Sequence, residues 1–277
     1  MLNDLYQMLD PVAFTLGPLS VRWYGIAYIL GFVCAALVIM RISKRWKVAI
    51  DVDSLMTVVL GVIIGVIVGA RLGYCLFYGD GYYLQHPLAI LALSEGGMSF
   101  HGGLVGALLS GLITAPMVKI PYLTLADMVV CGAPLGLLFG RCANFINGEL
   151  WGAVTDAPWG VVFGGPAGMM PRHPSQLYEA VLEGIVLFLI LFALSRKTPP
   201  RPQGTFLGVF LTWYGLCRIA VEFVRQPDAQ LGYLAGDWLT MGMLLSLPLV
   251  IIGVGLLIYA AKTKKPQQGQ LSSSSSK

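Results

Sequence analysis

Seven apolar runs, each long enough to cross a lipid bilayer, determine what this chain is able to fold into. A helix needs about 20 predominantly apolar residues to span the hydrocarbon core. Because backbone polar groups in lipid must be hydrogen-bonded within their own segment, such runs form helices. The sequence therefore predicts an all-α integral membrane protein with seven transmembrane helices, at residues 21–42, 54–72, 99–118, 125–147, 175–194, 204–224 and 239–261.

The composition agrees with a membrane protein. Of the 277 residues, 56% are hydrophobic and 12% are charged, whereas soluble domains carry about 25% charged residues. The formal net charge of +4 is small. No dense basic stripe with interleaved aromatic residues occurs in the sequence, so nucleic acid is not an expected partner.

The cysteines and the motif search indicate neither a metal site nor a disulfide framework. Five cysteines lie within or beside apolar runs, an odd number without a C-x-x-C pair. Small, buried hydrophobic side chains are the expected role for such cysteines. The sequence also has no G-x-S-x-G, no H-E-x-x-H and no clustered metal ligands, which weakens the case for a hydrolase or a metalloenzyme.

The connecting segments differ in charge. Lys and Arg gather at 41–47, 119, 196–201 and 262–265, whereas the loops at 73–98, 148–174 and 225–238 carry two arginines between them. Since Lys and Arg accumulate on the cytoplasmic side, the N-terminus is expected outside and the C-terminus inside, with structured outer loops. Residues 1–261 are expected to form one transmembrane domain, followed by a solvated cytoplasmic tail at 262–277.

Glycine recurs at every fourth position in two of the predicted helices, at 61, 65, 69 and 73 and at 132, 136 and 140. Small residues at this spacing let helix backbones approach closely in lipid. We interpret both stripes as packing surfaces. Pro134 is expected to bend the fourth span near its middle.

Two arginines are predicted at the same depth of the membrane. Arg141 and Arg218 each lie about six residues, or roughly 9 Å, below the outer end of their spans. Asn144 shares a helix face with Arg141, while Tyr214 and Glu222 lie one turn from Arg218. A buried arginine in an apolar helix is costly and needs a partner.

Two kinds of partner are consistent with these positions. Structural ion pairs would join Arg218 to Glu222, and Arg141 to Glu149 or Asn144. Alternatively, the two guanidinium groups form a clamp for a phosphate, which arginine binds bidentately while staying charged. The common depth favours the clamp, because the phosphate of a lipid headgroup lies near the interface.

Other polar residues near the outer surface each have two interpretations. His101, between glycines at the start of the third span, is either a structural hydrogen-bonding residue or a general base. His173 precedes a helix that carries Glu179 and Glu183, and its segment has either a helix-start role, with Ser175 as the N-cap, or a functional one. Tyr24 is an interfacial anchor or lines a cavity.

At the cytoplasmic start of the fourth span stands Asp127. A carboxylate is favourable at a helix N-terminus, and we expect that structural role for Asp127.

Five segments resemble the signature of bacterial prolipoprotein diacylglyceryl transferases, in the order of that family and across residues 10–261. They are Arg-Trp-Tyr-Gly at 22–25, Gly-Gly-Met-Ser-Phe-His-Gly-Gly at 96–103, Gly-Arg-Cys-Ala-Asn-Phe-Ile-Asn-Gly-Glu-Leu-Trp-Gly at 140–152, Arg-His-Pro-Ser-Gln-Leu-Tyr-Glu at 172–179 and Glu-Phe-Val-Arg-Gln-Pro-Asp at 222–228.

The resemblance implies a reaction and a location. The enzyme would transfer the diacylglyceryl group of phosphatidylglycerol to the thiol of a lipobox cysteine in a preprolipoprotein and release glycerol phosphate. Its domain at 1–261 would then be catalytic and would lie in the bacterial cytoplasmic (inner) membrane, with the active site towards the outer leaflet. No cofactor or metal is implied, and the expected partners are phosphatidylglycerol, the lipobox peptide and membrane lipids.

The resemblance also implies a set of important residues. At the matching positions stand Tyr24, His101, Arg141, Asn144, Glu149, Gly152, Tyr214 and Arg218. Glu222, in the last similar segment, joins them as a substrate-binding residue.

We assign roles to these residues as hypotheses. Arg141 and Arg218 hold the phosphate and stabilise charge on the leaving group. His101 is the candidate base, although the two arginines alone are an alternative means of activating the thiol. Asn144 and Glu149 orient Arg141, while two tyrosines line the pocket, Tyr24 and Tyr214.

Transport or lipid scaffolding is the rival class for a seven-span protein with arginines in the membrane. A transporter would place polar residues near the bilayer midplane, often in broken helices. In this sequence they concentrate in the predicted outer half, apart from Asp127. Together with the resemblance, this distribution favours the enzyme.

Overall fold

The computed structural model confirms the all-α membrane class. It describes residues 2–17, 19–93, 96–198, 200–227, 232–236 and 238–269. This part of the chain has seven helices long and apolar enough to cross a membrane: α2 (Trp23–Trp46), α3 (Val52–Phe77), α5 (Phe100–Met117), α6 (Tyr122–Asn147), the composite span Ser175–Ser195, α9 (Thr205–Glu222) and α10 (Met241–Thr263). Each of the seven predicted runs therefore forms a helix. The largest difference is that α2 and α3 continue beyond their predicted ends at 42 and 72.

The fifth span is not a uniform α-helix. It consists of α7 (Ser175–Glu179), a π-helical segment η4 (Ala180–Val186) and α8 (Leu187–Ser195). π-helical turns inside α-helices are rare and frequently mark functional sites. This one carries Glu183, one of the acidic residues singled out by the sequence.

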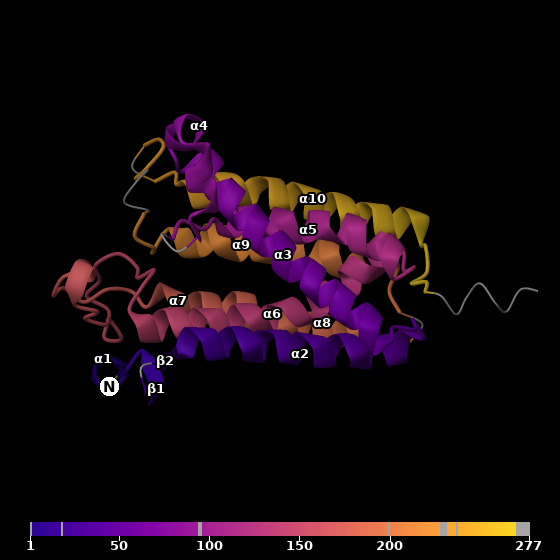
Figure 1. Cartoon of the computed structure of the whole chain (residues 1–277), viewed down its shortest axis with the longest axis horizontal. Coiled ribbons are helices and arrows are strands. Elements are labelled where there is room, and N and C mark those ends of the chain that lie inside the picture. The colour runs from indigo at the N-terminus through magenta and orange to yellow at the C-terminus, as the bar shows by residue number, and fades with distance from the viewer. Residues whose placement is uncertain are drawn as a thin grey trace, which may run out of the picture.

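The helices pack mainly as three pairs, α2 with α6, α3 with α5 and α9 with α10, and the fifth span lies against α6 and α9. Figure 1 shows α2, α6, α7 and α8 in the lower half of the bundle and α5 and α10 in the upper half, while α3 crosses obliquely from one half to the other. The glycine stripes lie within two of these pairs. A Cβ atom at Gly65 would be 2.5 Å from the Gly106 carbonyl oxygen, and one at Gly132 would be 2.7 Å from the Cα of Ala35. The stripe at 61–73 is therefore confirmed as a packing surface along its whole length, whereas the second is confirmed only at Gly132 and Gly136, since Gly140 has open space around it.

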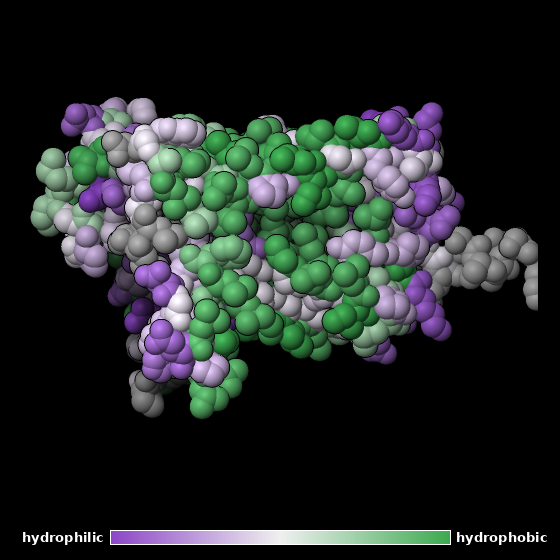
Figure 2. Space-filling view, turned by 90° about the horizontal axis from the view of Figure 1, so that it is seen from above, coloured by the Kyte–Doolittle hydropathy of each residue, from purple (hydrophilic) through white to green (hydrophobic). Residues whose placement is uncertain are grey.

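The surface matches a lipid environment. Large hydrophobic side chains such as Leu37, Ile64, Leu109 and Ile251 are exposed along the spans. Figure 2 shows hydrophobic residues over the middle of one face and hydrophilic residues gathered at its two ends. A band of this kind is what a hydrocarbon core would cover.

An N-terminal segment that the sequence did not predict packs on one end of the bundle. It comprises α1 (Leu2–Gln7) and an antiparallel hairpin of β1 (Val12–Leu16) and β2 (Leu19–Arg22). The Tyr6 ring lies edge-on to Phe145 and Phe163, with centroid distances of 5.3 and 4.9 Å. This contact joins the segment to the end of α6 and to the loop at 148–174, which includes η3 (Gly165–Ala167).

Arg71, near the end of α3, is buried and binds the loop at 73–98. This loop contains α4 (Tyr82–Gln85) and η1 (Pro87–Leu91). The guanidinium of Arg71 donates to the carbonyls of Ala89 at 2.7 Å and Ile90 at 2.8 Å, and also to that of Gly96. One side chain thus binds carbonyls from two parts of this loop, η1 and the turn at Gly96.

At the opposite end of the bundle, Asp127 caps a helix N-terminus, as expected, but the helix is not the one that carries it. Its carboxylate accepts from the backbone N–H groups of Gly204 and Leu207, both at 2.8 Å. Asp127 therefore caps the N-terminus of α9 rather than that of its own helix α6. Sequence position alone identifies the nearest helix start but not the helix that packs across from it.

In the C-terminal tail, residues 262–266 and 268 are exposed, whereas Gln267 is buried. The amide of Gln267 is buried and donates to Asp127 Oδ2 at 2.7 Å and to the Arg201 carbonyl at 3.1 Å. Gln203 donates through its backbone N–H to the Lys265 carbonyl at 2.9 Å. Tail residues thus form hydrogen bonds with Asp127 on α6 and with the segment just before α9. The serine run lies outside the described residues.

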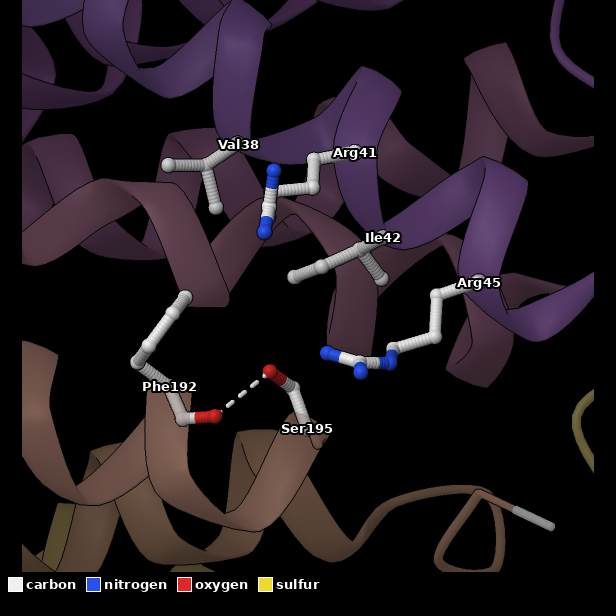
Figure 3. A pocket seen from close by; sticks show the side chains of 6 residues that line it. All are labelled: Val38, Arg41, Ile42, Arg45, Phe192 and Ser195. Carbon is white, nitrogen blue, oxygen red and sulfur yellow. Dashed lines mark hydrogen bonds between the residues drawn. The ribbon is translucent and has the colours of Figure 1, made fainter. Parts of the chain in front are cut away.

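A small cavity lies between α2 and α8 at this same end (Figure 3). Its volume is about 20 Å³, and its lining residues are Val38, Arg41, Ile42, Arg45, Phe192 and Ser195. A space of this size accommodates about one water molecule. It is therefore too small for a lipid headgroup.

Candidate active site

A cavity of about 320 Å³ lies at the end of the bundle that carries α1 and α4, on the left in Figure 1. Side chains from α3, α5, α6 and α9 and from the adjoining loops form its walls. The three predicted catalytic residues, His101, Arg141 and Arg218, are among those that line it, with Tyr74, Tyr78, Met98, Ser99, Phe100, Leu150, Arg225 and Gly242. The predicted convergence of two arginines from different helices is therefore confirmed.

One buried carboxylate joins the two arginines. Glu179, at the end of α7, is fully buried; its Oε2 lies 3.1 Å from Arg141 Nε and its Oε1 lies 2.8 Å from Arg218 Nη1. The contact with Arg218 is a charge-assisted hydrogen bond, whereas the contact with Arg141 is an ion pair without hydrogen-bond geometry. The spacing between the two guanidinium groups is thus set by a residue of a third helix.

Two further glutamates complete the ion-pair network. Glu222 Oε2 lies 2.7 Å from Arg218 Nη1 and 3.7 Å from Arg225 Nη1. Glu183 Oε2 lies 3.6 Å from Arg141 Nη2. The predicted pair of Arg218 with Glu222 is therefore confirmed. The predicted pairing of Arg141 with Glu149 or Asn144 is wrong, because its partners come from the fifth span.

Asn144 and Glu149 contact each other instead. The amides of Asn144 and Asn147 both donate to Glu149 Oε1, at 3.1 and 3.0 Å. The Gln176 amide donates to the Glu149 carbonyl at 2.6 Å. No hydrogen bond or ion pair joins this group to Arg141 within the described part of the chain. The carboxylate of Glu149 is therefore held at the exposed end of α6 by two amides.

Aromatic rings pack next to the arginines. Phe100 stacks on Tyr214 with a centroid distance of 5.0 Å, and the Arg141 guanidinium lies 5.9 Å from the centre of the Phe100 ring. That distance suits a cation–π contact. Tyr214 is fully buried and lies behind the lining residues rather than among them.

Tyr24 also lies outside the cavity lining. Its hydroxyl is 3.0 Å from that of Tyr28, at the start of α2. The expectation that Tyr24 and Tyr214 line the cavity is thus not met in this structure.

His101 has one hydrogen-bond neighbour that indicates its tautomer. Its Nε2 lies 3.4 Å from Ser246 Oγ, and the Ser246 hydroxyl donates to the Gly242 carbonyl at 2.7 Å. With the Ser246 hydroxyl donating to Gly242, the tautomer that suits this contact is the one with hydrogen on Nε2. Nδ1 of a neutral imidazole is then left with the lone pair that a base requires.

Gly152 sits where two loop segments meet. Its N–H donates to the His173 carbonyl at 2.8 Å, and a Cβ atom there would lie 2.6 Å from the Cβ of His173 and 2.5 Å from the Val224 carbonyl oxygen. A glycine is required at such a close approach. Gly152 thus holds the loop at 148–174 against the segment after α9.

The segment around His173 has a structural arrangement. His173 Nδ1 lies 3.0 Å from the Tyr178 hydroxyl, and His173 is not among the residues that line the cavity. Ser175 is the first residue of α7 rather than its N-cap, and its hydroxyl donates to the Leu150 carbonyl at 2.9 Å. These contacts favour the structural interpretation for both residues.

Sequence reasoning missed several residues of this site. Tyr74 and Tyr78 stack with a centroid distance of 5.6 Å and form the α3 wall of the cavity. The sequence also did not predict the partners of Glu179 and Glu183. The signal for both pairs is a spacing of four residues, which places them on one helix face. That spacing does not show which helix lies opposite.

The fold and the site together define a multi-pass membrane protein with buried arginines and carboxylates beside a cavity at one end of its bundle. A family model described as prolipoprotein diacylglyceryl transferase matches residues 11–259. The chain belongs to this family and is a transferase.

Similar curated proteins carry one name, phosphatidylglycerol–prolipoprotein diacylglyceryl transferase. The protein of Geobacter sulfurreducens is 52% identical over 256 residues, which cover 92% of this chain and 97% of the relative. That of Oleidesulfovibrio alaskensis is 50% identical over 269 residues, covering 94% and 96%. That of Brucella anthropi is 48% identical over 266 residues, covering 92% and 93%.

Proposed function

We propose that this chain transfers the diacylglyceryl group of phosphatidylglycerol to the thiol of a lipobox cysteine in a preprolipoprotein, the first step of bacterial lipoprotein maturation. The observation that carries this function is the placement of Arg141, Arg218 and His101 around one cavity in a chain of this family. Two guanidinium groups suit a phosphodiester, and a neighbouring imidazole suits a thiol.

The arginines hold the phosphate. Their buried carboxylate partners fix the orientation of both side chains, and the N–H groups that face the cavity donate to phosphate oxygens. When the glyceryl carbon–oxygen bond breaks, the leaving phosphate gains negative charge next to these fixed donors. Removing one such donor typically costs about 10²–10³ in rate.

The thiol has to lose its proton to attack. An unperturbed cysteine thiol has a pKa of about 8.5, so a base or a cationic field is needed at neutral pH. In this mechanism His101 Nδ1 accepts the proton. The thiolate forms a sulfur–carbon bond, the carbon–oxygen bond to the phosphate breaks, and glycerol phosphate leaves with that electron pair. No cofactor takes part, since the phosphoester is already a leaving group.

The remaining residues bind and position substrate. Glu149, fixed by Asn144 and Asn147, presents an exposed carboxylate beside the start of α2, where Tyr24 lies. Gly152 holds the loop at 148–174 in place, and Glu222 fixes Arg218 from one turn away. Tyr214 supports the Phe100 ring from behind.

The distribution of charge supports an orientation in the bacterial inner membrane. Basic residues occupy the last turns of α2 and α10, at the end of the bundle away from the cavity. Lys and Arg accumulate on the cytoplasmic side. The cavity would then face the outer leaflet, where exported lipoprotein precursors meet phospholipid, and residues 1–261 would form the catalytic domain.

One assay tests this function. The purified protein is incubated with labelled phosphatidylglycerol and a lipobox peptide, and the product is analysed for a thioether-linked diacylglyceryl group. A peptide with serine in place of the cysteine and phosphatidylcholine as donor serve as controls. Absence of the thioether product, together with movement of labelled lipid across vesicle membranes, would favour the rival transport class.

A further inference from the structure

A further buried arginine lies outside the ion-pair network of Arg141, Arg218 and Arg225. Arg71, near the end of α3, has an exposed fraction of only 3% and is not among the residues that line the cavity. Burial of a guanidinium group is costly unless its donors are satisfied. The contacts of Arg71 therefore indicate why a charge is placed there.

The guanidinium of Arg71 spans two parts of the loop at 73–98. Nε and Nη2 donate to two carbonyls of η1, those of Ile90 at 2.8 Å and Ala89 at 2.7 Å. Nη1 donates to the carbonyl of Gly96 and, at 3.3 Å, to that of Gly97. A planar group with five N–H donors in a fixed arrangement suits such a set of acceptors, whereas a lysine ammonium does not.

The turn that Arg71 binds leads directly into α5. Gly96 and Gly97 both have a φ angle of 80°, which glycine adopts without strain. A Cβ atom at Gly97 would lie 2.9 Å from Arg71 Nη1, so the turn packs closely on the guanidinium. The N–H of Ser99 donates to the carbonyl of Ala70, the residue before Arg71, at 2.9 Å. One position of α3 thus holds both the turn and the N-cap of α5.

The first turn of α5 carries side chains that face the cavity, those of Phe100 and His101. The N–H groups of a first helical turn have no partner within the helix and depend on the cap. Ser99 supplies this cap, since its Oγ accepts from the Gly102 N–H at 3.3 Å. The close glycine contacts between α3 and α5 involve Gly102 and Gly106. They hold the helix from its third residue on, whereas the turn and the cap hold the two residues before it.

We propose that Arg71 is a positioning residue for the transfer reaction, because it holds the turn at 96–99 and, through this turn, the imidazole of His101. The inference rests on the proposed function, in which His101 accepts the thiol proton. Without the guanidinium of Arg71 the turn opens and the first turn of α5 frays. His101 then loses its fixed distance to the thiol. Misplacement of a reacting group by about 1 Å costs on the order of 10² in rate.

The effects on lipid binding and on chemistry should differ. Arg141 and Arg218 come from α6 and α9, and Glu179 holds them in place. Arg71→Gln leaves these three residues unchanged, so its affinity for short-chain phosphatidylglycerol should remain that of the wild type. Its kcat should fall by about 10²-fold. Calorimetric titration and the transfer assay measure the two quantities on the full-length protein.

A double-mutant cycle tests whether Arg71 acts through His101. Transfer is measured for Arg71→Gln, for His101→Gln and for the double variant. In the background of His101→Gln, where no imidazole is left to position, Arg71→Gln should cost at most a few-fold rather than about 10²-fold. Arg172→Gln removes an arginine that binds carbonyls of the loop at 148–174 and is the matched comparison. Its loss, whatever its size, should multiply with that of His101→Gln.

Hydrogen–deuterium exchange gives a readout that is independent of activity. In Arg71→Gln the amides at 97–102 should exchange faster than in the wild type, whereas those of α6 and α9 should keep their wild-type rates. If Arg71→Gln does not fold, Arg71→Lys gives the same readouts, since it keeps the charge but loses the planar fork.

The outcomes separate this inference from the proposed function. Losses that multiply between Arg71→Gln and His101→Gln would overturn the positioning role, as would unchanged exchange at 97–102. A fall in lipid affinity as large as the fall in kcat would also overturn it. Full activity of His101→Gln alone would instead refute the base in the proposed function, and the exchange rates would then decide whether Arg71 holds the turn.

Discussion

Arg218 and Glu179 are 39 residues apart in the chain and are joined by a 2.8 Å ion pair in the interior of the bundle. The second oxygen of the same carboxylate contacts Arg141. Two arginines on separate helices are thus aligned by a residue of a third helix. The alignment exists before substrate arrives, which is the condition for effective stabilisation of charge in a transition state.

The planar fork of Arg141 should be essential for transfer. Arg141→Lys keeps the charge but loses the bidentate geometry, so the rate should fall by about 10²-fold or more. The assay of transfer from phosphatidylglycerol to peptide measures this loss. The matched control is Arg41→Lys, the same substitution at the end of the bundle away from the cavity, and this variant should transfer normally. Near-normal turnover of Arg141→Lys would contradict the clamp.

Removal of the bridging carboxylate should impair both stability and activity. Glu179→Ala leaves two buried arginines short of their shared partner, a type of change that destabilises by about 3–5 kcal/mol. Glu179→Gln retains the shape of the side chain and should lower the stability less than Glu179→Ala does. It should still lower the rate of transfer. Denaturation in detergent and the transfer assay give the two readouts. Wild-type stability and activity in both variants would show that the bridge is dispensable.

The role of His101 is open to a pH test. If Nδ1 accepts the thiol proton, His101→Asn and His101→Gln should both lower kcat, by about 10²–10⁴-fold. The pH profile of the residual transfer activity should also change. A matched measurement on Ser246→Ala, which removes the neighbour of Nε2 without touching the base, should show a smaller loss. If both His101 variants remain active with an unchanged profile, the histidine is structural.

A methyl group at residue 152 should displace a loop. In Gly152→Ala the new Cβ would approach the Val224 carbonyl and His173 to within 2.7 Å, which is tighter than van der Waals contact. The loop at 148–174 would move and transfer should fall strongly. Gly140→Ala, at a position with open space around it, provides the control. Equal activity of the two variants would exclude a steric role for Gly152.

Asp127 should matter for stability rather than for chemistry. Asp127→Ala would leave the N–H groups of Gly204 and Leu207 without their acceptor and should cost roughly 2–4 kcal/mol. Gln267→Ala removes one donor to the same carboxylate and should cost less. Both folded variants should transfer at the wild-type rate per molecule. A selective loss of activity at full stability would contradict this assignment.

The spans were predictable because length and apolarity are local properties of the sequence. The glycine stripes were also readable, since their spacing defines one face of a helix. The hairpin of β1 and β2 and the short helix α1 were not, because they depend on contacts such as that of Tyr6 with Phe145. The helix that Asp127 caps depends likewise on which segments pack together.

At the site, the depth argument identified Arg141 and Arg218 because counting residues from the end of a span measures depth. Their partners could not be assigned in the same way. Glu179 and Glu183 lie on a span whose rotation is altered by η4, and helical periodicity assumes a uniform α-helix. The proximity of Glu149 to Arg141 in sequence was misleading, since the chain leaves α6 before reaching it.

The close contact of α3 with α5 restricts how the cavity is able to change width. A Cβ atom at Gly73 would be 2.7 Å from the Cα of Gly102, so the two backbones meet with no side chains between them to slide. Tyr74 on α3 and Phe100 and His101 on α5 therefore belong to one closely packed wall of the cavity. The wall that carries Arg141 and Arg218 is tied together by Glu179. Relative movement of these two walls would separate the Phe100 ring from Tyr214 and Arg141, and a crosslink between α5 and α6 should oppose such movement.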